Sequence, residues 1–170
     1  MDDHPIVRHG LRELINQEKN LEVCGDAEDV ARAFQAIKEK KPDLVIVDIS
    51  LKGRDGMELI KMIKAYDNRL PVLVLSIHEE ELYAERALRA GARGYLMKQD
   101  GTEKVVTAVG ELLQSGIYLS ETMKSRLLGQ VAGAAKQPKS KELEVRNLSD
   151  RELQVFKLLG QGRSTSQIAD

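Results

Sequence analysis

The most constraining feature of this sequence is a short aliphatic run, residues 44–47, that ends on the carboxylate of Asp48. An uninterrupted run of this length, rich in β-branched residues, is typical of a strand buried on both faces of a parallel sheet. Asp48 then lies at the carboxyl end of that strand, where open α/β sheets bind their ligands. The alternative is that Asp48 only caps the following turn, because aspartate is common in turns.

Helix and strand patterns alternate along the first 117 residues. Apolar residues recur with a helical period in five segments, and short apolar runs separate these segments. The alternation predicts an α/β fold with a doubly wound parallel sheet. We expect strands at 21–25, 44–50, 71–76 and 95–98, with helices that contain Ile6, Val30, Leu59, Glu79 and Val105.

Three successive predicted strands end on polar side chains of different types, namely Asp48, Ser76 and Lys98. The carboxyl ends of parallel strands meet at one edge of a sheet, so these side chains are expected to converge. The acidic pair Asp2 and Asp3 precedes the first helix and is placed at the same edge. A consistent set of complementary groups favours a functional site over a series of turn caps.

A cluster of Asp2, Asp3 and Asp48 carries up to three negative charges, and like charges at close range disfavour joint ionisation. A divalent cation relieves this repulsion, and Mg²⁺ suits carboxylate oxygens together with water and phosphate. We therefore expect a Mg²⁺ site in which Asp3 is a direct ligand and Asp2 a direct or water-mediated one. The backbone carbonyl of Ser50 would complete the set of protein ligands.

The same residues suit phosphoryl transfer to a carboxylate. Asp48 is predicted to be the nucleophile that becomes an aspartyl phosphate. Lys98 would pair with the phosphoryl group and Ser76 would donate a hydrogen bond to it, so that the charge on the transferring oxygens is neutralised.

Residues 2–116 resemble the receiver domain of bacterial two-component response regulators. The resemblance implies a flavodoxin-like fold in which a sensor histidine kinase phosphorylates Asp48 from a phosphohistidine, with Mg²⁺ as cofactor. It also matches Ser76 and Tyr95 to the switch pair of the family; the alternative for Tyr95 is an aromatic packed at a strand edge. The motifs that carry it are Asp2-Asp3, Val45–Asp48, Asp55-Gly56, Leu75-Ser76 and Gly91–Lys98.

Features around this domain resemble the NarL/FixJ (LuxR-type) subfamily. They are His4-Pro5, Gln99-Asp100 and the segment Gly116–Ser120. Lys52 departs from the family because many receivers carry proline there. His4 is interpreted as a first-turn residue and not as a ligand or a base.

The remainder of the chain divides into three parts. An extra helix is predicted within 118–131, with Ser120 as its N-cap and Gly129 as its end. Residues 132–146 have the composition of a linker. The lysines at 136, 139 and 141 are either solvated or contact DNA phosphates.

Residues 147–170 open with a capping box formed by Ser149 and Glu152, and Ser164 with Gln167 repeats the pattern. Two short helices joined by a glycine turn suggest a helix-turn-helix unit. The segment resembles the start of a LuxR-type DNA-binding domain, without its recognition helix. We therefore expect DNA to be a partner of the full-length protein.

The resemblance also implies a first strand ahead of Asp2, at the centre of a 2-1-3-4-5 sheet. Without it, the predicted strands at 21–25 and 44–50 would not pair with each other and would leave unpaired backbone groups between them. The expected fold is thus a receiver sheet lacking its first strand, truncated at both ends of the chain.

Composition limits the function in a few ways. A formal net charge of −1 does not favour nucleic acid or membrane as a global partner, and the single cysteine, Cys24, excludes an internal disulfide framework. No apolar run approaches the length of a membrane span, so we expect a cytoplasmic protein without a membrane partner.

The leading hypothesis is a phosphorylation-dependent regulator of transcription, not an enzyme beyond self-catalysed phosphorylation and dephosphorylation. Activation by homodimerisation and activation by release of the second domain both remain open. One alternative is an aspartate-nucleophile phosphatase or dehalogenase, although Ser50 stands where such enzymes carry a second aspartate. Another is an interaction module that is not phosphorylated.

Overall fold

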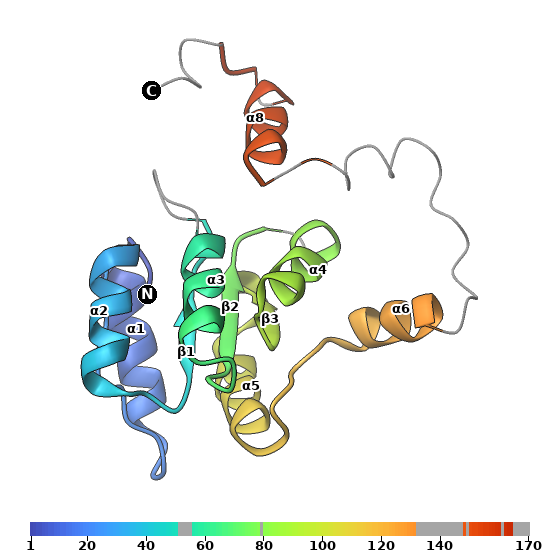
Figure 1. Cartoon of the computed structure of the whole chain (residues 1–170). Helices are drawn as coiled ribbons and strands as arrows, with labels where there is room; N and C mark the ends of the chain where they lie inside the picture. Colours follow the sequence, from blue (N-terminus) through green and yellow to red (C-terminus); the bar gives the residue numbers. More distant parts are fainter. Residues whose placement is uncertain (51–55, 79, 132–147, 149, 161, 165–170) are drawn as a thin grey trace. The chain divides into compact units, whose positions relative to one another are not determined.

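The computed structural model describes residues 1–50, 56–78, 80–131, 148, 150–160 and 162–164. The chain divides into two compact units, Met1–Leu128 and Gly129–Asp170, and each is described by itself. Figure 1 shows the order of the elements along the chain.

The first unit is built on a parallel sheet of three strands in the order β1-β2-β3. The strands are β1 (Val45–Val47), β2 (Val72–Ser76) and β3 (Gly94–Met97). Both pairs are parallel, with Val45 opposite Val72 and Leu73 opposite Gly94. The carboxyl ends of the three strands therefore lie at one edge of the sheet. The parallel doubly wound α/β architecture predicted from the sequence is confirmed.

Helices cover both faces of this sheet (Figure 1). The helices are α1 (Pro5–Asn16), α2 (Val30–Lys40), α3 (Gly56–Tyr66), α4 (Glu80–Ala90) and α5 (Thr102–Ser115). Side chains alternate along β2, so that Val72 and Val74 pack with α2, α3 and α4, whereas Leu73 and Leu75 pack with α5 and the inner residues of α1.

A short 3-10 helix and a further α-helix accompany these elements. The 3-10 helix η1 (Lys98–Asp100) directly follows β3. The helix α6 (Glu121–Val131) begins after Ser120, whose hydroxyl accepts a hydrogen bond from the Met123 N–H at 3.1 Å, which confirms the predicted N-cap. Buried Met123 joins the core on the α4 side of the sheet.

The predicted end of α6 at Gly129 is wrong. The helix continues to Val131. A glycine inside a helix is less favourable than alanine by about 1 kcal/mol but does not force the helix to end.

The predicted strand at 21–25 is also wrong, because this segment forms no strand. A strand needs a hydrogen-bonded neighbour, and Met1 and Asp2 bond to residues outside this segment. Met1 donates from its amino group to the Ile46 carbonyl at 2.7 Å and accepts from the Asp48 N–H at 3.0 Å. The Asp2 N–H donates to the Ala27 carbonyl at 3.2 Å. Met1 and Asp2 therefore lie between β1 and the segment that precedes α2.

The second unit contains the helix α8 (Asp150–Gly160). It ends in a turn where the Gly162 N–H donates to the Leu159 carbonyl and Gly162 has a φ of 77°. The predicted linker 132–146, the capping residues Ser149 and Gln167, and Lys52 with its loop lie outside the described residues.

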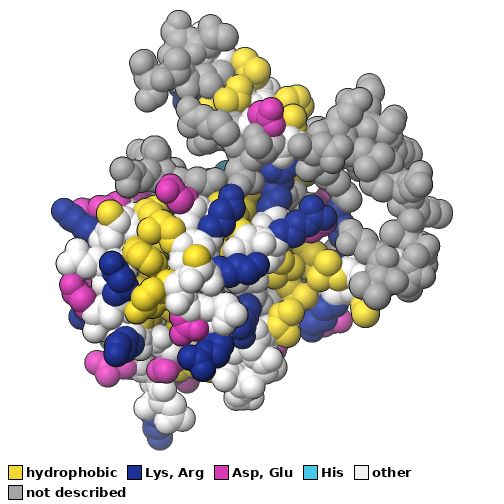
Figure 2. Space-filling model, in the orientation of Figure 1, with side chains coloured by type: hydrophobic (Ala, Val, Ile, Leu, Met, Phe, Trp, Pro, Cys, Tyr) yellow, Lys and Arg dark blue, Asp and Glu magenta, His cyan; other side chains and the backbone are white. Residues whose placement is uncertain are grey.

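Charged side chains of both signs are spread over the face of the first unit that Figure 2 shows. This agrees with the formal net charge of −1 for the chain. Among the described residues, no helix is long and apolar enough to cross a membrane.

Candidate functional site

The polar side chains predicted to converge do meet at the carboxyl edge of the sheet. Asp48 directly follows β1, Ser76 is the last residue of β2, and Lys98 directly follows β3. Asp2 reaches the same edge because Met1 pairs alongside β1. Parallel strand direction alone accounts for the convergence of the first three residues.

The Lys98 ammonium bridges two buried carboxylates. Its Nζ lies 2.6 Å from Asp2 Oδ2 and 2.7 Å from Asp48 Oδ2. The exposed fractions of Asp2 and Asp48 are only 2% and 1%, so these charges have little access to water. Lys98 is thus their common counter-charge.

The pKa values of this group follow from that pairing. Burial raises the pKa of Asp2, but hydrogen bonds from Lys98 and from the His4 backbone outweigh it and hold the pKa below its ordinary value. Burial lowers the pKa of Lys98, but hydrogen bonds to Asp2 and Asp48 outweigh it and raise the pKa above its ordinary value. Near neutral pH, Asp2 is therefore ionised and Lys98 is protonated.

Asp3 and His4 complete the acidic cluster. Asp3 Oδ1 is a buried atom without a hydrogen bond, although it lies 2.8 Å from His4 Nδ1. The His4 N–H donates to Asp2 Oδ1 at 2.9 Å. One ligand atom from each of Asp2, Asp3, His4 and Asp48 lies within 4.8 Å of the others. The sequence interpretation did not include the His4 ring in the cluster, although its position next to the acidic pair is a signal for it.

Ser50 contributes more than the backbone carbonyl considered from the sequence. Its N–H donates to Asp48 Oδ1 at 2.7 Å, and its Oγ lies 3.1 Å from Ser76 Oγ. With Lys98 on Oδ2, both oxygens of the Asp48 carboxylate are hydrogen-bonded. Two fixed donors therefore orient this carboxylate.

Ser76 and Tyr95 are linked through His78. Ser76 Oγ accepts from the His78 N–H at 3.0 Å, and the Tyr95 hydroxyl donates to the His78 carbonyl at 2.9 Å. Tyr95 is only 1% exposed, and burial raises its pKa, so the hydroxyl remains a donor. The predicted pair is thus joined by a residue that the sequence did not single out.

Gly56, which opens α3, presses against the backbone of Asp48. A Cβ at Gly56 would lie 2.3 Å from the Asp48 carbonyl oxygen and 2.8 Å from Ile49 Cα. Such approaches are too close for any other residue without backbone movement. The Asp55-Gly56 motif is the sequence signal for this close contact.

The donor set is suited to a hard divalent cation. Three carboxylates converge, and Asp3 Oδ1 is buried without a hydrogen bond, with the His4 ring nitrogen 2.8 Å away. Carboxylate oxygens are the ligands that Mg²⁺ prefers. The residues present therefore fit such an ion.

Comparison with known proteins agrees with this geometry. A family model described as the response regulator receiver domain matches residues 1–110. The BvgA protein of Bordetella pertussis, a transcription regulator of virulence factors, is 34% identical over 171 residues that cover all of this chain and 78% of BvgA.

Two solved structures are also similar. A LuxR-family two-component response regulator from Aurantimonas matches with a TM-score of 0.69 and 30% identity, over 77% of this chain and 94% of that one. RcsB of Salmonella enterica, bound to a promoter in the presence of a phosphomimetic, matches with a TM-score of 0.67 and 27% identity, over 99% of this chain and 78% of that one.

Proposed function

This chain belongs to the response regulator receiver family, and from that membership we propose that it regulates transcription through phosphorylation of Asp48. The observation that carries the assignment of Asp48 is its environment. The carboxylate is 1% exposed, lies at the end of a parallel strand, and is held by the Ser50 N–H and the Lys98 ammonium. Aspartate side chains are almost never fully buried unless they are paired, and here Lys98 is the partner.

Asp2, Asp3, Asp48 and the backbone carbonyl of Ser50 are the residues that would hold Mg²⁺. When bound, the ion supplies positive charge to neutralise the phosphoryl oxygens. The chain's own part is to place its carboxylates before the ion arrives. Met1, paired with β1, fixes Asp2 beside Asp48, and α3 fixes the backbone of Asp48 through Gly56.

The reaction we propose is attack of an Asp48 carboxylate oxygen on the phosphorus of a phosphohistidine carried by a sensor kinase. The new O–P bond forms as the P–N bond breaks, and the imidazole nitrogen keeps the electron pair and takes up a proton from solvent. Lys98 Nζ lies 2.7 Å from the Asp48 carboxylate before the reaction. After it, Nζ would pair with an oxygen of the phosphoryl group on that carboxylate.

Ser76 and Tyr95 are proposed to transmit this change. The Ser76 hydroxyl, now bonded to Ser50 and His78, would turn to donate to the phosphoryl group. The His78 N–H would then lose its acceptor, so the residues after β2 would rearrange. Because the Tyr95 hydroxyl is tied to the His78 carbonyl, Tyr95 would respond to the same movement.

The partners follow from the family. A sensor histidine kinase is proposed as the phosphoryl donor, and DNA as the target of the LuxR-type segment 147–170. A homodimer is a further proposal for the phosphorylated form. In this scheme the receiver catalyses only its own phosphorylation and dephosphorylation, and its relatives are regulators of transcription and not enzymes in the ordinary sense.

The phosphatase or dehalogenase hypothesis is not favoured. Its second aspartate would stand at position 50, where this chain has Ser50 with a hydroxyl directed to Ser76. The relatives are transcription regulators, which also disfavours it.

The test is phosphorylation of this chain by acetyl phosphate in the presence of Mg²⁺, followed by mass spectrometry. We expect one hydroxylamine-labile phosphoryl group that disappears in Asp48→Asn. The matched control is Asp43→Asn, an exposed residue two positions ahead of β1, which should be phosphorylated like the parent. A labile adduct that persists in Asp48→Asn would refute the assignment.

A further inference from the structure

Arg8, near the start of α1, joins the acidic cluster to the segment that precedes α2. Its Nη1 donates to the Asp2 carbonyl oxygen at 2.8 Å, and its Nε donates to Asp26 Oδ2 at 2.9 Å. Only 16% of the Arg8 side chain is exposed. A guanidinium is a rigid planar fork of donors, so this one side chain holds two points of the fold in a fixed relation.

The carbonyl that Arg8 binds belongs to the peptide group between Asp2 and Asp3. A trans peptide group is planar and contains the Cα atoms of both residues that it joins. A bond to this oxygen therefore fixes the plane from which both side chains project. Arg8 thus acts on the two acids through their backbone and not through a carboxylate.

The backbone of Asp2 is also held directly by the segment 21–27. The Asp2 N–H donates to the Ala27 carbonyl at 3.2 Å, and Asp26 is the residue that binds Arg8. Both backbone polar groups of Asp2 are therefore tied to residues 26–27, one directly and one through Arg8. The orientation of the Asp2 peptide is thus set from outside the acidic cluster.

Asp26 is a firm anchor for Arg8. Its second oxygen, Oδ1, accepts a hydrogen bond from Arg12 Nη2. Burial raises the pKa of Asp26, but hydrogen bonds from Arg12 and Arg8 outweigh it and hold the pKa below its ordinary value, so Asp26 is ionised near neutral pH. Glu28 Oε2 lies 4.0 Å from Arg8 Nη2. Because these acids balance the charge of Arg8, its main effect on the acidic cluster is positional.

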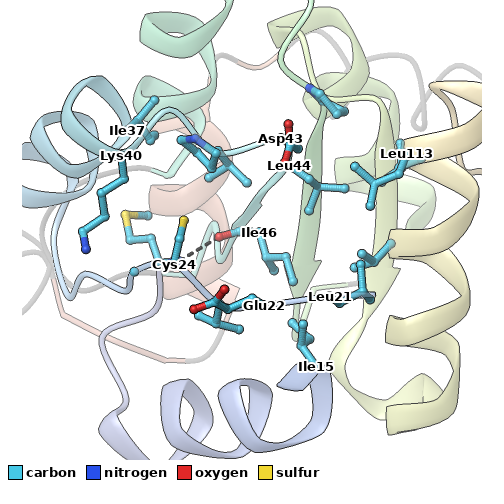
Figure 3. Close-up of a pocket in the computed structure, with 18 of the residues that line it drawn as sticks. Ile15, Leu21, Glu22, Cys24, Ile37, Lys40, Asp43, Leu44, Ile46 and Leu113 are labelled. Carbon is cyan, nitrogen blue, oxygen red and sulfur yellow. Dashed lines mark hydrogen bonds between the residues drawn. The ribbon is translucent and has the colours of Figure 1, made fainter. Parts of the chain in front are cut away.

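A cavity of about 970 Å³ lies between the segment 21–27 and β1. Leu21 and Cys24 of the segment and Ile46 of β1 line it (Figure 3). Arg8 and Asp26 line it as well. Side chains therefore do not fill the space beside β1, and close packing alone does not fix the segment against the sheet. The ion pairs of Asp26 with α1 supply a fixed attachment.

We propose that Arg8 is a positioning residue for the metal site: braced by Asp26, it holds the Asp2–Asp3 peptide in the orientation that directs both carboxylates to the same ion. The inference rests on the proposed function, because it needs the Mg²⁺ site. Arg8 itself contacts neither the ion nor the phosphoryl group. Without Arg8 the peptide is free to turn, and binding must then restore its orientation at a cost in affinity.

The first measurement is the Mg²⁺ affinity of the whole chain, obtained by titrating a ¹⁵N-labelled sample with MgCl₂ and following the amide shifts of residues 2–4 by NMR. Arg8→Met should raise the Kd about tenfold, because a charge-assisted hydrogen bond that fixes the site is lost. Arg8→Lys keeps the charge but not the fork, so it should weaken binding by a similar factor. The same spectra report whether each variant is folded.

Arg12→Met is the matched control. Arg12 pairs with the same Asp26 carboxylate, and no hydrogen bond joins it to Asp2 in the described part of the chain. It should therefore bind Mg²⁺ like the parent. Asp26→Asn leaves Arg8 in place but weakens its brace, so it should raise the Kd in the same direction as Arg8→Met and by less. It decides the question if Arg8→Met does not fold.

The second measurement is the rate of Asp48 phosphorylation by acetyl phosphate as a function of Mg²⁺ concentration. In Arg8→Met the half-saturating Mg²⁺ concentration should rise about tenfold, while the rate at saturating Mg²⁺ changes by less than about twofold. A residue that only stabilised the fold would lower the rate at every Mg²⁺ concentration and leave the half-saturating concentration unchanged, and that result would overturn the proposal.

Three further results would overturn it: a folded Arg8→Met chain with the Mg²⁺ affinity of the parent, parent-like affinity in Arg8→Lys, or an equal loss of affinity in Arg12→Met. Each of these leaves phosphorylation of the parent at Asp48 intact. A parent chain that neither binds Mg²⁺ nor is phosphorylated would instead overturn the proposed function, and this inference with it.

Discussion

Removal of the Lys98 ammonium tests the electrostatics of the site most directly. In Lys98→Met, Asp2 and Asp48 keep their buried positions but lose their common counter-charge. Both Oδ2 atoms lie within 2.7 Å of Nζ, so they are at most about 5 Å apart, and at an effective dielectric constant of about 20 their repulsion is about 3 kcal/mol. Breaking a buried ion pair from one side has a similar magnitude, about 3–5 kcal/mol.

We therefore expect Lys98→Met to lower the free energy of unfolding by about 3 kcal/mol near neutral pH in the presence of EDTA. Urea denaturation followed by circular dichroism measures this. Millimolar Mg²⁺ should recover much of the loss, because a cation held by the same carboxylates replaces the missing charge. Adding Asp48→Asn to Lys98→Met should also recover much of it, because one of the two repelling charges is then gone.

Lys104→Met is the matched control. Lys104 pairs with Asp100 at 3.5 Å on the surface, with 58% of its side chain exposed, and such pairs contribute less than about 1 kcal/mol. A Lys98→Met chain as stable as the parent in EDTA would contradict this role of Lys98. So would a loss of stability that Asp48→Asn leaves unchanged.

Three other predictions follow from the first unit. The pKa of Asp2 is depressed in the folded state, so its contribution to stability is complete above the ordinary pKa of 3.8 and is lost as the pH falls through the pKa of the folded state. Asp2→Asn should therefore flatten the loss of stability below about pH 4, measured by urea denaturation. Gly56→Ala should destabilise the chain by about 2 kcal/mol or more in thermal unfolding, because its Cβ meets the Asp48 carbonyl at 2.3 Å, whereas Gly10→Ala, in an open position of α1, should stabilise by about 0.5–1 kcal/mol. Ser120→Ala should destabilise by about 1 kcal/mol, since the Met123 N–H loses its cap and Glu80 loses the hydroxyl that donates to it at 2.7 Å, whereas Ser120→Thr, which keeps a hydroxyl, should lose less.

The chemistry of the site was readable from the chain because its residues follow strands. An aliphatic run identifies a strand locally, and in a parallel sheet the residue after each run goes to the same edge whatever the details of packing. The sequence therefore predicted that Asp48, Ser76 and Lys98 lie close together. The Ser120 cap was equally readable, because a cap depends on residues within one turn of each other.

The parts of the site that no local sequence pattern specifies are seen only in the tertiary structure. His4 joins the acidic cluster because Met1 pairs with β1, and that pairing joins residues about 45 positions apart. The hydroxyl contact between Ser50 and Ser76, and the link through His78, likewise depend on how two strand ends approach each other.

The segment 21–25 shows the same limit for secondary structure. Its alternation of apolar and polar residues is that of a strand. A strand, however, exists only if a neighbour accepts its hydrogen bonds. What the amino acids specified was the aliphatic strands, their polar ends and the helices between them, because those depend on nearby residues. That Met1 pairs beside β1, whereas residues 21–25 form no strand, depends on which backbone lies beside each segment, and only the tertiary structure contains that information.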